Sequence, residues 1–96
     1  MDILVAYDVA TDTAAGRRRL RQVAQVCKDY GQRVQNSVFE CTVNEVQYET
    51  LRHRLLKCIN KEDDNLRIYR LIGPKERYVE SYGIDRYVDF QGPLVV

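Results

Sequence analysis

The segment ILVAYDV, residues Ile3–Val9, decides how the fold begins. Both faces of this segment are apolar up to Asp8, which predicts a central β-strand that is covered on both sides and ends on a carboxylate. A buried carboxylate is costly unless it is paired, hydrogen-bonded or bound to a metal, so Asp8 is the first candidate functional residue. Alternation places Ile3, Val5, Tyr7 and Val9 on one face and Leu4, Ala6 and Asp8 on the other.

A helix is predicted over about residues 14–30, directly after this strand. The segment Thr11-Asp12-Thr13 supplies turn and N-cap chemistry, and Gly31 stands where a C-terminal glycine ends a helix. The predicted buried stripe consists of Leu20, Val23, Ala24 and Cys27. The helix also carries four arginines, of which Arg17 extends this stripe toward the sheet, Arg18 and Arg19 rotate away, and Arg21 returns within one turn of Arg17.

The remaining pattern predicts an α+β fold of the ferredoxin-like kind. It is a sandwich with two helices on one face of an antiparallel sheet, in a single domain over residues 1–96. Residues 33–43 form one kinked strand or two short strands, with little room for a full hairpin. Thr42 and Glu45 have capping-box spacing at the start of the second helix. The other expected elements are a helix over about residues 44–59, strands over residues 66–72 and 78–82, and an extended tail over residues 87–96.

Composition narrows the classes of function. The chain has 96 residues and a net charge of +1 from 15 basic and 14 acidic side chains, so a contact with nucleic acid would need a local basic patch. No apolar run approaches the roughly 18–20 residues of a membrane span. The acidic N-terminus is unlike a signal peptide. Cys27, Cys41 and Cys58 lie in apolar patterns without zinc-ligand spacing, which favours reduced thiols and a cytoplasmic location.

Two interpretations of Asp8 follow from its position. Ligand-binding groups often lie at the carboxyl end of a strand, whereas many aspartates at such a position cap a turn or pair with an arginine. A single carboxylate per chain does not by itself build an ordinary metal site. Mg²⁺ usually takes one or two protein carboxylates together with phosphate and water. A two-fold dimer would bring two copies of Asp8 together.

The arginine-rich helix also has two interpretations. Basic side chains at a helix N-terminus oppose the macrodipole, so the cluster makes sense if it binds an anion such as phosphate. A solvated charged face is the usual alternative. Arg33 opens the segment RVQNSVFE, whose polar residues suit a sheet edge, an interface or a ligand contact. His53 is predicted to lie on the surface of the second helix.

These residues resemble the small CRISPR-associated Cas-two proteins. The resemblance rests on Tyr7-Asp8, on RRRLRQVAQVCKDYG at residues 17–31, on RVQNSVFEC at residues 33–41 and on the ending GPLVV. It implies a symmetric homodimer in which C-terminal strands complete the neighbour's sheet, and Leu94, Val95 and Val96 are expected at that interface.

The resemblance also implies a Mg²⁺-dependent phosphodiesterase that acts on single-stranded RNA or double-stranded DNA. It further implies a role in spacer acquisition with the Cas-one integrase. Asp8 matches the metal-binding and catalytic aspartate of these proteins. Basic residues expected to contact nucleic acid are Arg17, Arg18, Arg19, Arg21 and Arg33.

Three hypotheses of function follow. The first is a Mg²⁺-dependent endonuclease, based on Asp8 and the arginines. The second is a non-catalytic adaptor that binds duplex DNA and bridges integrase subunits, because no general base is evident. The third is a ferredoxin-like regulatory domain for a small ligand, which would leave the arginine cluster without a purpose.

Overall fold

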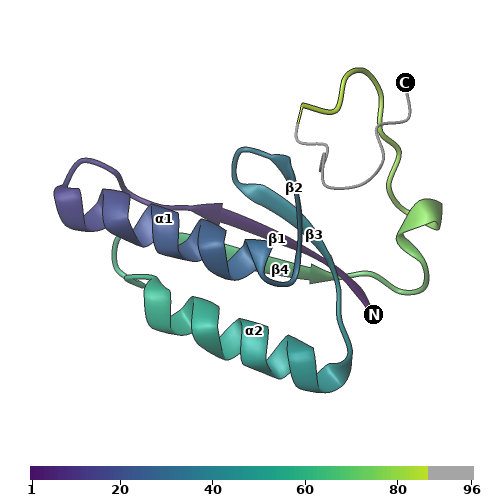
Figure 1. The fold of residues 1–96 in the computed structure, drawn as a ribbon, viewed down its shortest axis with the longest axis horizontal. Helices are drawn as coiled ribbons and strands as arrows, with labels where there is room; N and C mark the ends of the chain where they lie inside the picture. The colour runs from purple at the N-terminus through teal and green to yellow at the C-terminus, as the bar shows by residue number, and fades with distance from the viewer. Residues whose placement is uncertain (87–96) are drawn as a thin grey trace.

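The fold is taken from a computed structural model, which describes residues 1–86 (Figure 1). The helices and strands alternate along the chain in a β-α-β-β-α-β order, followed by one 3₁₀ turn. Their bounds are β1 (Asp2–Asp8), α1 (Ala14–Lys28), β2 (Gly31–Gln35), β3 (Val38–Thr42), α2 (Glu45–Cys58), β4 (Asn65–Arg70) and the turn at Lys75–Arg77.

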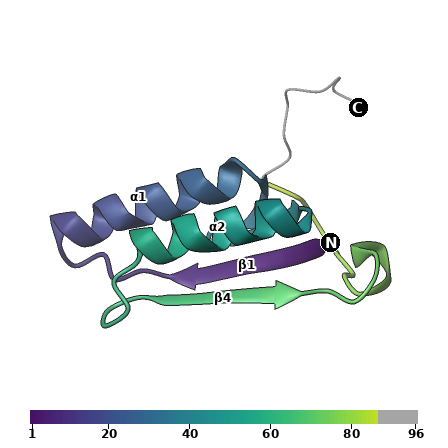
Figure 2. The same ribbon diagram turned by 90° about the horizontal axis from the view of Figure 1, so that it is seen from below.

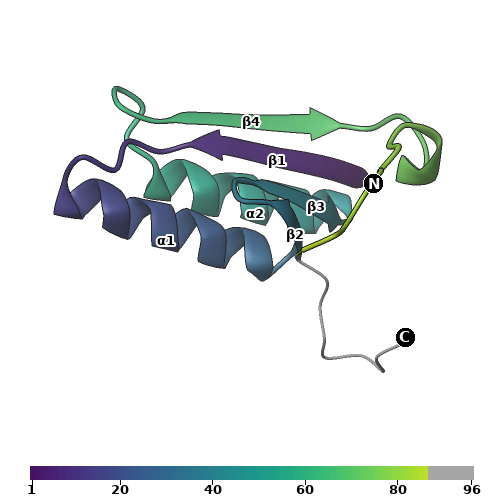
Figure 3. The ribbon, with the colours of Figure 1, turned by 90° about the horizontal axis from the view of Figure 1, so that it is seen from above.

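The four strands form one sheet in the order β2-β3-β1-β4, and every neighbouring pair is antiparallel. Both helices lie against the same face of this sheet, as the edge-on views show (Figures 2 and 3). This arrangement confirms the predicted ferredoxin-like sandwich with two helices on one face.

The core lies between the sheet and the helices. One face of β1 is buried against α1 and α2, through a cluster that includes Ile3, Val5, Tyr7, Val9, Val23, Cys27, Phe39, Leu51 and Leu55. On the opposite face Leu4 and Ala6 are only half-buried and Asp8 is exposed. The prediction that β1 is covered on both sides is therefore wrong for the single chain, because both helices pack on one side of the sheet.

Helix α1 begins as predicted, but its buried stripe differs from the predicted one. Thr13 is the N-cap, and its side chain accepts a hydrogen bond from the amide of Gly16. Gly16 rather than Arg17 continues the buried stripe, and a Cβ atom at Gly16 would lie 2.0 Å from the carbonyl oxygen of Ala10. Because a glycine has no apolar side chain, the hydrophobic pattern did not show this close approach.

Helix α2 begins with a different capping box from the predicted pair. Asn44 accepts from the amide of Gln47, and the Gln47 side chain accepts from the amide of Asn44. Thr42 instead lies in β3 and donates its hydroxyl to Asp2 at 2.7 Å. The spacing of Thr42 and Glu45 was misleading because the strand continues through Thr42.

The segment after α1 is a hairpin, although the prediction allowed little room for one. A two-residue turn at Asn36-Ser37 joins two five-residue strands, with a register shift between Arg33 and Gln35. The predicted strand at residues 78–82 is wrong, because no strand pairs with it within residues 1–86 and the 3₁₀ turn precedes it. The predictions for the tail, including Leu94, Val95 and Val96, lie outside the described residues.

Candidate functional site

Asp8 is the last residue of β1, and its side chain is exposed. Its Cα pairs across the sheet with Asn65 of β4. Within residues 1–86 no hydrogen bond or ion pair engages its carboxylate, so neither the turn-cap nor the arginine-pair interpretation is borne out there. The carboxylate is open to solvent in the single chain.

A cavity of about 480 Å³ opens beside Asp8. Its wall brings together the end of β1, the middle of α1 and the β2–β3 hairpin. The backbone joins two of these segments directly, since the amide of Tyr7 donates to the carbonyl of Ser37 at 3.1 Å. The lining residues are Tyr7, Asp8, Val9, Leu20, Arg21, Ala24, Arg33, Asn36 and Ser37. Two of the five predicted arginines therefore share a concave surface with Asp8.

Arg33 is held at this wall by aromatic rings. Its guanidinium lies 5.1 Å from the ring centroid of Phe39, which is fully buried. The Phe39 ring in turn stacks on Tyr7 with a centroid distance of 6.3 Å. Burial raises the pKa of Tyr7, and the positive charge of Arg33 opposes that rise. The phenol therefore stays neutral at physiological pH, and Arg33 places a fixed positive charge beside the end of β1.

The arginines of α1 point in three directions. Arg17 is exposed and donates to the carbonyl of Thr11 at 3.1 Å, so the prediction that it faces the sheet is wrong. Arg18 is exposed, and Arg21 lines the cavity beside Asp8. Arg17 and Arg18 thus form a solvated end of the helix, whereas Arg21 belongs to the same surface as Asp8.

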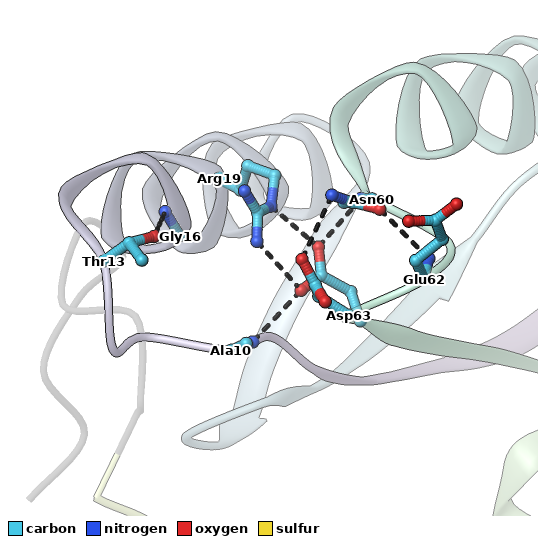
Figure 4. Close-up of polar contacts among 8 residues, drawn as sticks. Ala10, Thr13, Gly16, Arg19, Asn60, Glu62 and Asp63 are labelled. Carbon is cyan, nitrogen blue, oxygen red and sulfur yellow. Dashed lines mark hydrogen bonds and ion pairs between the residues drawn. The ribbon is translucent and has the colours of Figure 1, made fainter.

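Arg19 does not rotate away into solvent, contrary to the prediction. Its Nε lies 2.9 Å from a carboxylate oxygen of Asp64, and only 19% of the Arg19 side chain is exposed. Figure 4 shows Arg19 reaching from α1 toward the turn that carries Asn60 and Asp63. Asp64 was missed because it lies in the run Lys61-Glu62-Asp63-Asp64-Asn65, which looks like an ordinary polar turn in the sequence.

Comparison with known protein families assigns the chain to one of them. Residues 1–78 match the model of the family described as CRISPR associated protein Cas2. The chain belongs to the Cas2 family. A "CRISPR-associated endoribonuclease Cas2 1" of Moorella thermoacetica is 60% identical over 96 residues, which is the full length of both chains. A "CRISPR-associated endonuclease Cas2" of Halalkalibacterium halodurans is 46% identical over 99% of each chain.

Solved structures agree with this assignment. The crystal structure of Streptococcus pyogenes Cas2 at pH 6.5 superposes with a TM-score of 0.77 at 52% identity, and covers 86% of this chain and 100% of that one. A hypothetical protein from Thermus thermophilus gives a TM-score of 0.71 at 38% identity, over 86% of this chain and 90% of its own. The resemblance to the Cas2 family noted in the sequence is therefore confirmed.

The chemistry of the donor set limits what metal the site could hold. An exposed carboxylate with no partner among residues 1–86 is a suitable Mg²⁺ ligand. Those residues contain no group of three or more His, Cys, Asp or Glu side chains that could hold a metal ion. Among residues 1–86, Asp8 therefore supplies one carboxylate ligand, and the remaining ligands of a Mg²⁺ ion would have to come from elsewhere.

The remaining titratable groups do not join the site. Burial raises the pKa of Cys27 to about 12 and that of Cys41 to about 11, so both thiols stay protonated in the core. All three cysteines are free, as predicted. His53 is exposed on α2, also as predicted. Among residues 1–86, none of the helices is long and apolar enough to span a membrane.

Proposed function

We propose that the chain is a Mg²⁺-dependent endonuclease that takes part in spacer acquisition with the Cas-one integrase. Its substrate would be the phosphodiester backbone of single-stranded RNA or double-stranded DNA. Membership of the Cas2 family and the names of its relatives as endoribonuclease and endonuclease support this proposal. The observation that carries it is the cavity in which Asp8 lies with Arg21 and Arg33.

Each of these residues has a distinct role in the proposed reaction. Asp8 offers carboxylate oxygens at the open end of β1, where no other described group engages them. Arg21 and Arg33 bind non-bridging phosphate oxygens and stabilise the negative charge that develops during cleavage. A bound Mg²⁺ would polarise the phosphodiester and lower the pKa of a coordinated water. The stacked rings of Tyr7 and Phe39 keep Arg33 in place and limit its motion.

We also propose a homodimer, because a second copy of the chain would add a second carboxylate to the single one that Asp8 supplies. The open face of the sheet supports this part of the proposal. Its centre is apolar, with half-buried Leu4, Ala6 and Val38 beside Tyr69, which is 46% exposed. Association of two such faces would remove apolar area from water, and Asp8 lies on this face, at the end of β1. Deletion of residues 94–96 is expected to weaken this dimer, as measured by its dissociation constant.

Cleavage assays test the proposed function. Wild-type protein and Asp8→Ala, purified in parallel, are incubated with RNA and duplex DNA of matched sequence, with Mg²⁺ or with a chelator. The wild type should cut at least one substrate only with Mg²⁺, and Asp8→Ala should not. An Asp8→Ala protein that cuts as fast as the wild type would show that Asp8 is not the catalytic carboxylate, or that a contaminating nuclease is present.

A second candidate function is supported by a different observation. Besides Asp8, the described lining of the cavity contains no histidine, glutamate, lysine or cysteine that could act as a separate general base, and the single histidine, His53, is exposed on α2. This favours an adaptor that binds duplex DNA and bridges integrase subunits without cutting. In that case Asp8→Ala would retain full integration activity in a reconstituted reaction with the integrase, while replacement of the cavity arginines Arg21 and Arg33 would reduce it.

A further inference from the structure

The carboxylate of Asp64 is fully buried, in contrast to the exposed Asp8 nearby. It accepts four hydrogen bonds from three separate parts of the chain. The amide of Ala10 donates at 3.1 Å, the amide of Asn60 at 2.9 Å, and Arg19 donates through Nε at 2.9 Å and through Nη2 at 3.3 Å. Ala10, Asn60 and Arg19 converge in this way on the turn between α2 and β4 (Figure 4).

These contacts surround the end of β1. Ala10 lies two residues after Asp8, and Asn65, next to Asp64, is the cross-strand partner of Asp8. Arg19 lies in the second turn of α1, two residues before Arg21 at the middle of the helix. One carboxylate therefore fixes the position of the β1–α1 connection relative to both β4 and α1. The distance between Asp8 and the arginines of α1 depends on that connection.

The same contacts determine what Arg19 can do. Two of its nitrogens face Asp64, and the paired carboxylate neutralises its charge. The hydrogen bond to Asp64 also raises the pKa of Arg19, which keeps the pair ionised. Arg18, the preceding residue, has no such partner among residues 1–86 and is exposed. Of the arginines on α1, Arg19 is thus the least suited to bind a phosphate.

We propose that Arg19 and Asp64 form a positioning pair that holds Asp8 in register with Arg21, and that Arg19 does not contact the nucleic acid. This inference rests on the proposed function, because it concerns the same site. A displacement of about 1 Å in a catalytic group can lower a rate by up to about 100-fold. Loss of the pair should therefore act on turnover, through the position of Asp8, rather than on the electrostatics of binding.

The test compares Arg19→Gln, Asp64→Asn and the double variant with the matched control Arg18→Gln. Duplex DNA binding is measured at several salt concentrations, and kcat and KM are measured with Mg²⁺. The slope of log K against log salt is negative, and each lost phosphate contact decreases its magnitude by about 0.9. We expect this decrease for Arg18→Gln and no decrease for Arg19→Gln. We further expect kcat to fall about tenfold or more for Arg19→Gln and Asp64→Asn, with no further fall in the double variant.

The opposite result would overturn the inference. If Arg19→Gln decreases the magnitude of the salt slope as Arg18→Gln does, while Asp64→Asn leaves both the slope and kcat unchanged, Arg19 binds phosphate and the pair has no positioning role. Arg19→Lys provides a second test if Asp64→Asn does not fold. Lysine retains the charge but not the two-nitrogen contact, so a positioning role predicts a fall in kcat and a phosphate role predicts none.

Failure of the proposed function gives a different pattern. If the wild-type protein binds duplex DNA but never cuts it, the proposed nuclease function is wrong. The salt dependence of binding then remains as the test of whether Arg19 contacts the DNA. In that case equal slopes for the wild type and Arg19→Gln would support the exclusion of Arg19 from binding, and a slope of smaller magnitude for Arg19→Gln would reject it.

Discussion

Asp8 and Asp64 are two carboxylates at the same end of the sheet, and they differ in almost every physical respect. Asp8 is exposed and has no partner within residues 1–86, whereas the side chain of Asp64 is buried and accepts four hydrogen bonds. A carboxylate whose lone pairs all accept hydrogen bonds within the protein has none left to bind a metal or a substrate. A hydrated carboxylate without partners adds little to stability but remains available. Asp8 is therefore the carboxylate expected to take part in catalysis, and Asp64 is the one expected to hold Asp8 in position.

The largest expected effect is on catalysis at Asp8. Asp8→Asn should lower the Mg²⁺-dependent cleavage rate by about 100-fold or more, because an amide is a much poorer Mg²⁺ ligand than a carboxylate. Its free energy of unfolding should stay within about 0.5 kcal/mol of the wild type, because the side chain is exposed and unpaired. Single-turnover cleavage and urea denaturation measure the two effects. A marked loss of stability would mean that Asp8 is structural, and the contrast with Asp64 would disappear.

The next effect is on stability at Asp64. Asp64→Ala should lower the free energy of unfolding by roughly 2–3 kcal/mol, because it leaves the part-buried amide donors of Ala10 and Asn60 without this acceptor and removes the partner of Arg19. Urea denaturation at neutral pH measures this change. The control is Asp29→Ala, which removes an ion pair with Arg54 whose two side chains are each 39% exposed, and which should cost much less. Equal losses for the two variants would contradict the special role of Asp64.

A substitution at Gly16 of α1 tests the β1–α1 connection, which Asp64 contacts at Ala10. Gly16→Ala would place a Cβ atom 2.0 Å from the carbonyl oxygen of Ala10, so the β1–α1 connection must shift. The expected loss is roughly 1–3 kcal/mol, which thermal or urea denaturation would detect. Ala15→Gly, at an exposed neighbouring position on the helix, is the control for helix propensity. A Gly16→Ala protein as stable as the wild type would show that this contact is not tight.

The smallest effect is a change in the dependence of stability on pH. Hydrogen bonds from Arg19, and then from the amides of Asn60 and Ala10, hold the pKa of Asp64 below its usual value. Because this pKa is lower in the folded than in the unfolded state, its contribution to stability is present above about pH 4 and is lost as pH falls through the folded pKa. Asp64→Asn should therefore flatten the fall in stability below about pH 4. Denaturation curves between pH 2 and 7 would show whether this slope changes.

Much of the fold could be predicted from local patterns. The alternation in β1, the spacing of Val23, Ala24 and Cys27, and the cap at Thr13 each depend on residues close together in the chain, and all three were confirmed. The errors arose where a distant segment decided the outcome. The hairpin at residues 31–42 is stable because β3 pairs with β1, and residues 78–82 form no strand because no neighbour pairs with them in the described part of the chain.

The candidate site was also predicted from local patterns only in part. The sequence identified Asp8 and the arginine-rich helix, and the cavity brings Asp8 together with Arg21 and Arg33. The sequence could not show that Arg19 is ion-paired and Arg18 is exposed, because both belong to one basic run. The difference depends on Asp64, 45 residues farther along the chain from Arg19.

The sequence by itself determined the ferredoxin-like order of helices and strands, the family resemblance and the position of Asp8 at the end of β1. Hydrophobic periodicity and turn chemistry are local, so one chain read in order is sufficient for them. Only the tertiary structure decided which charges are available. Burial and pairing depend on which segments meet in space, and the folded chain leaves Asp8 exposed while it encloses the Asp64 side chain with Arg19.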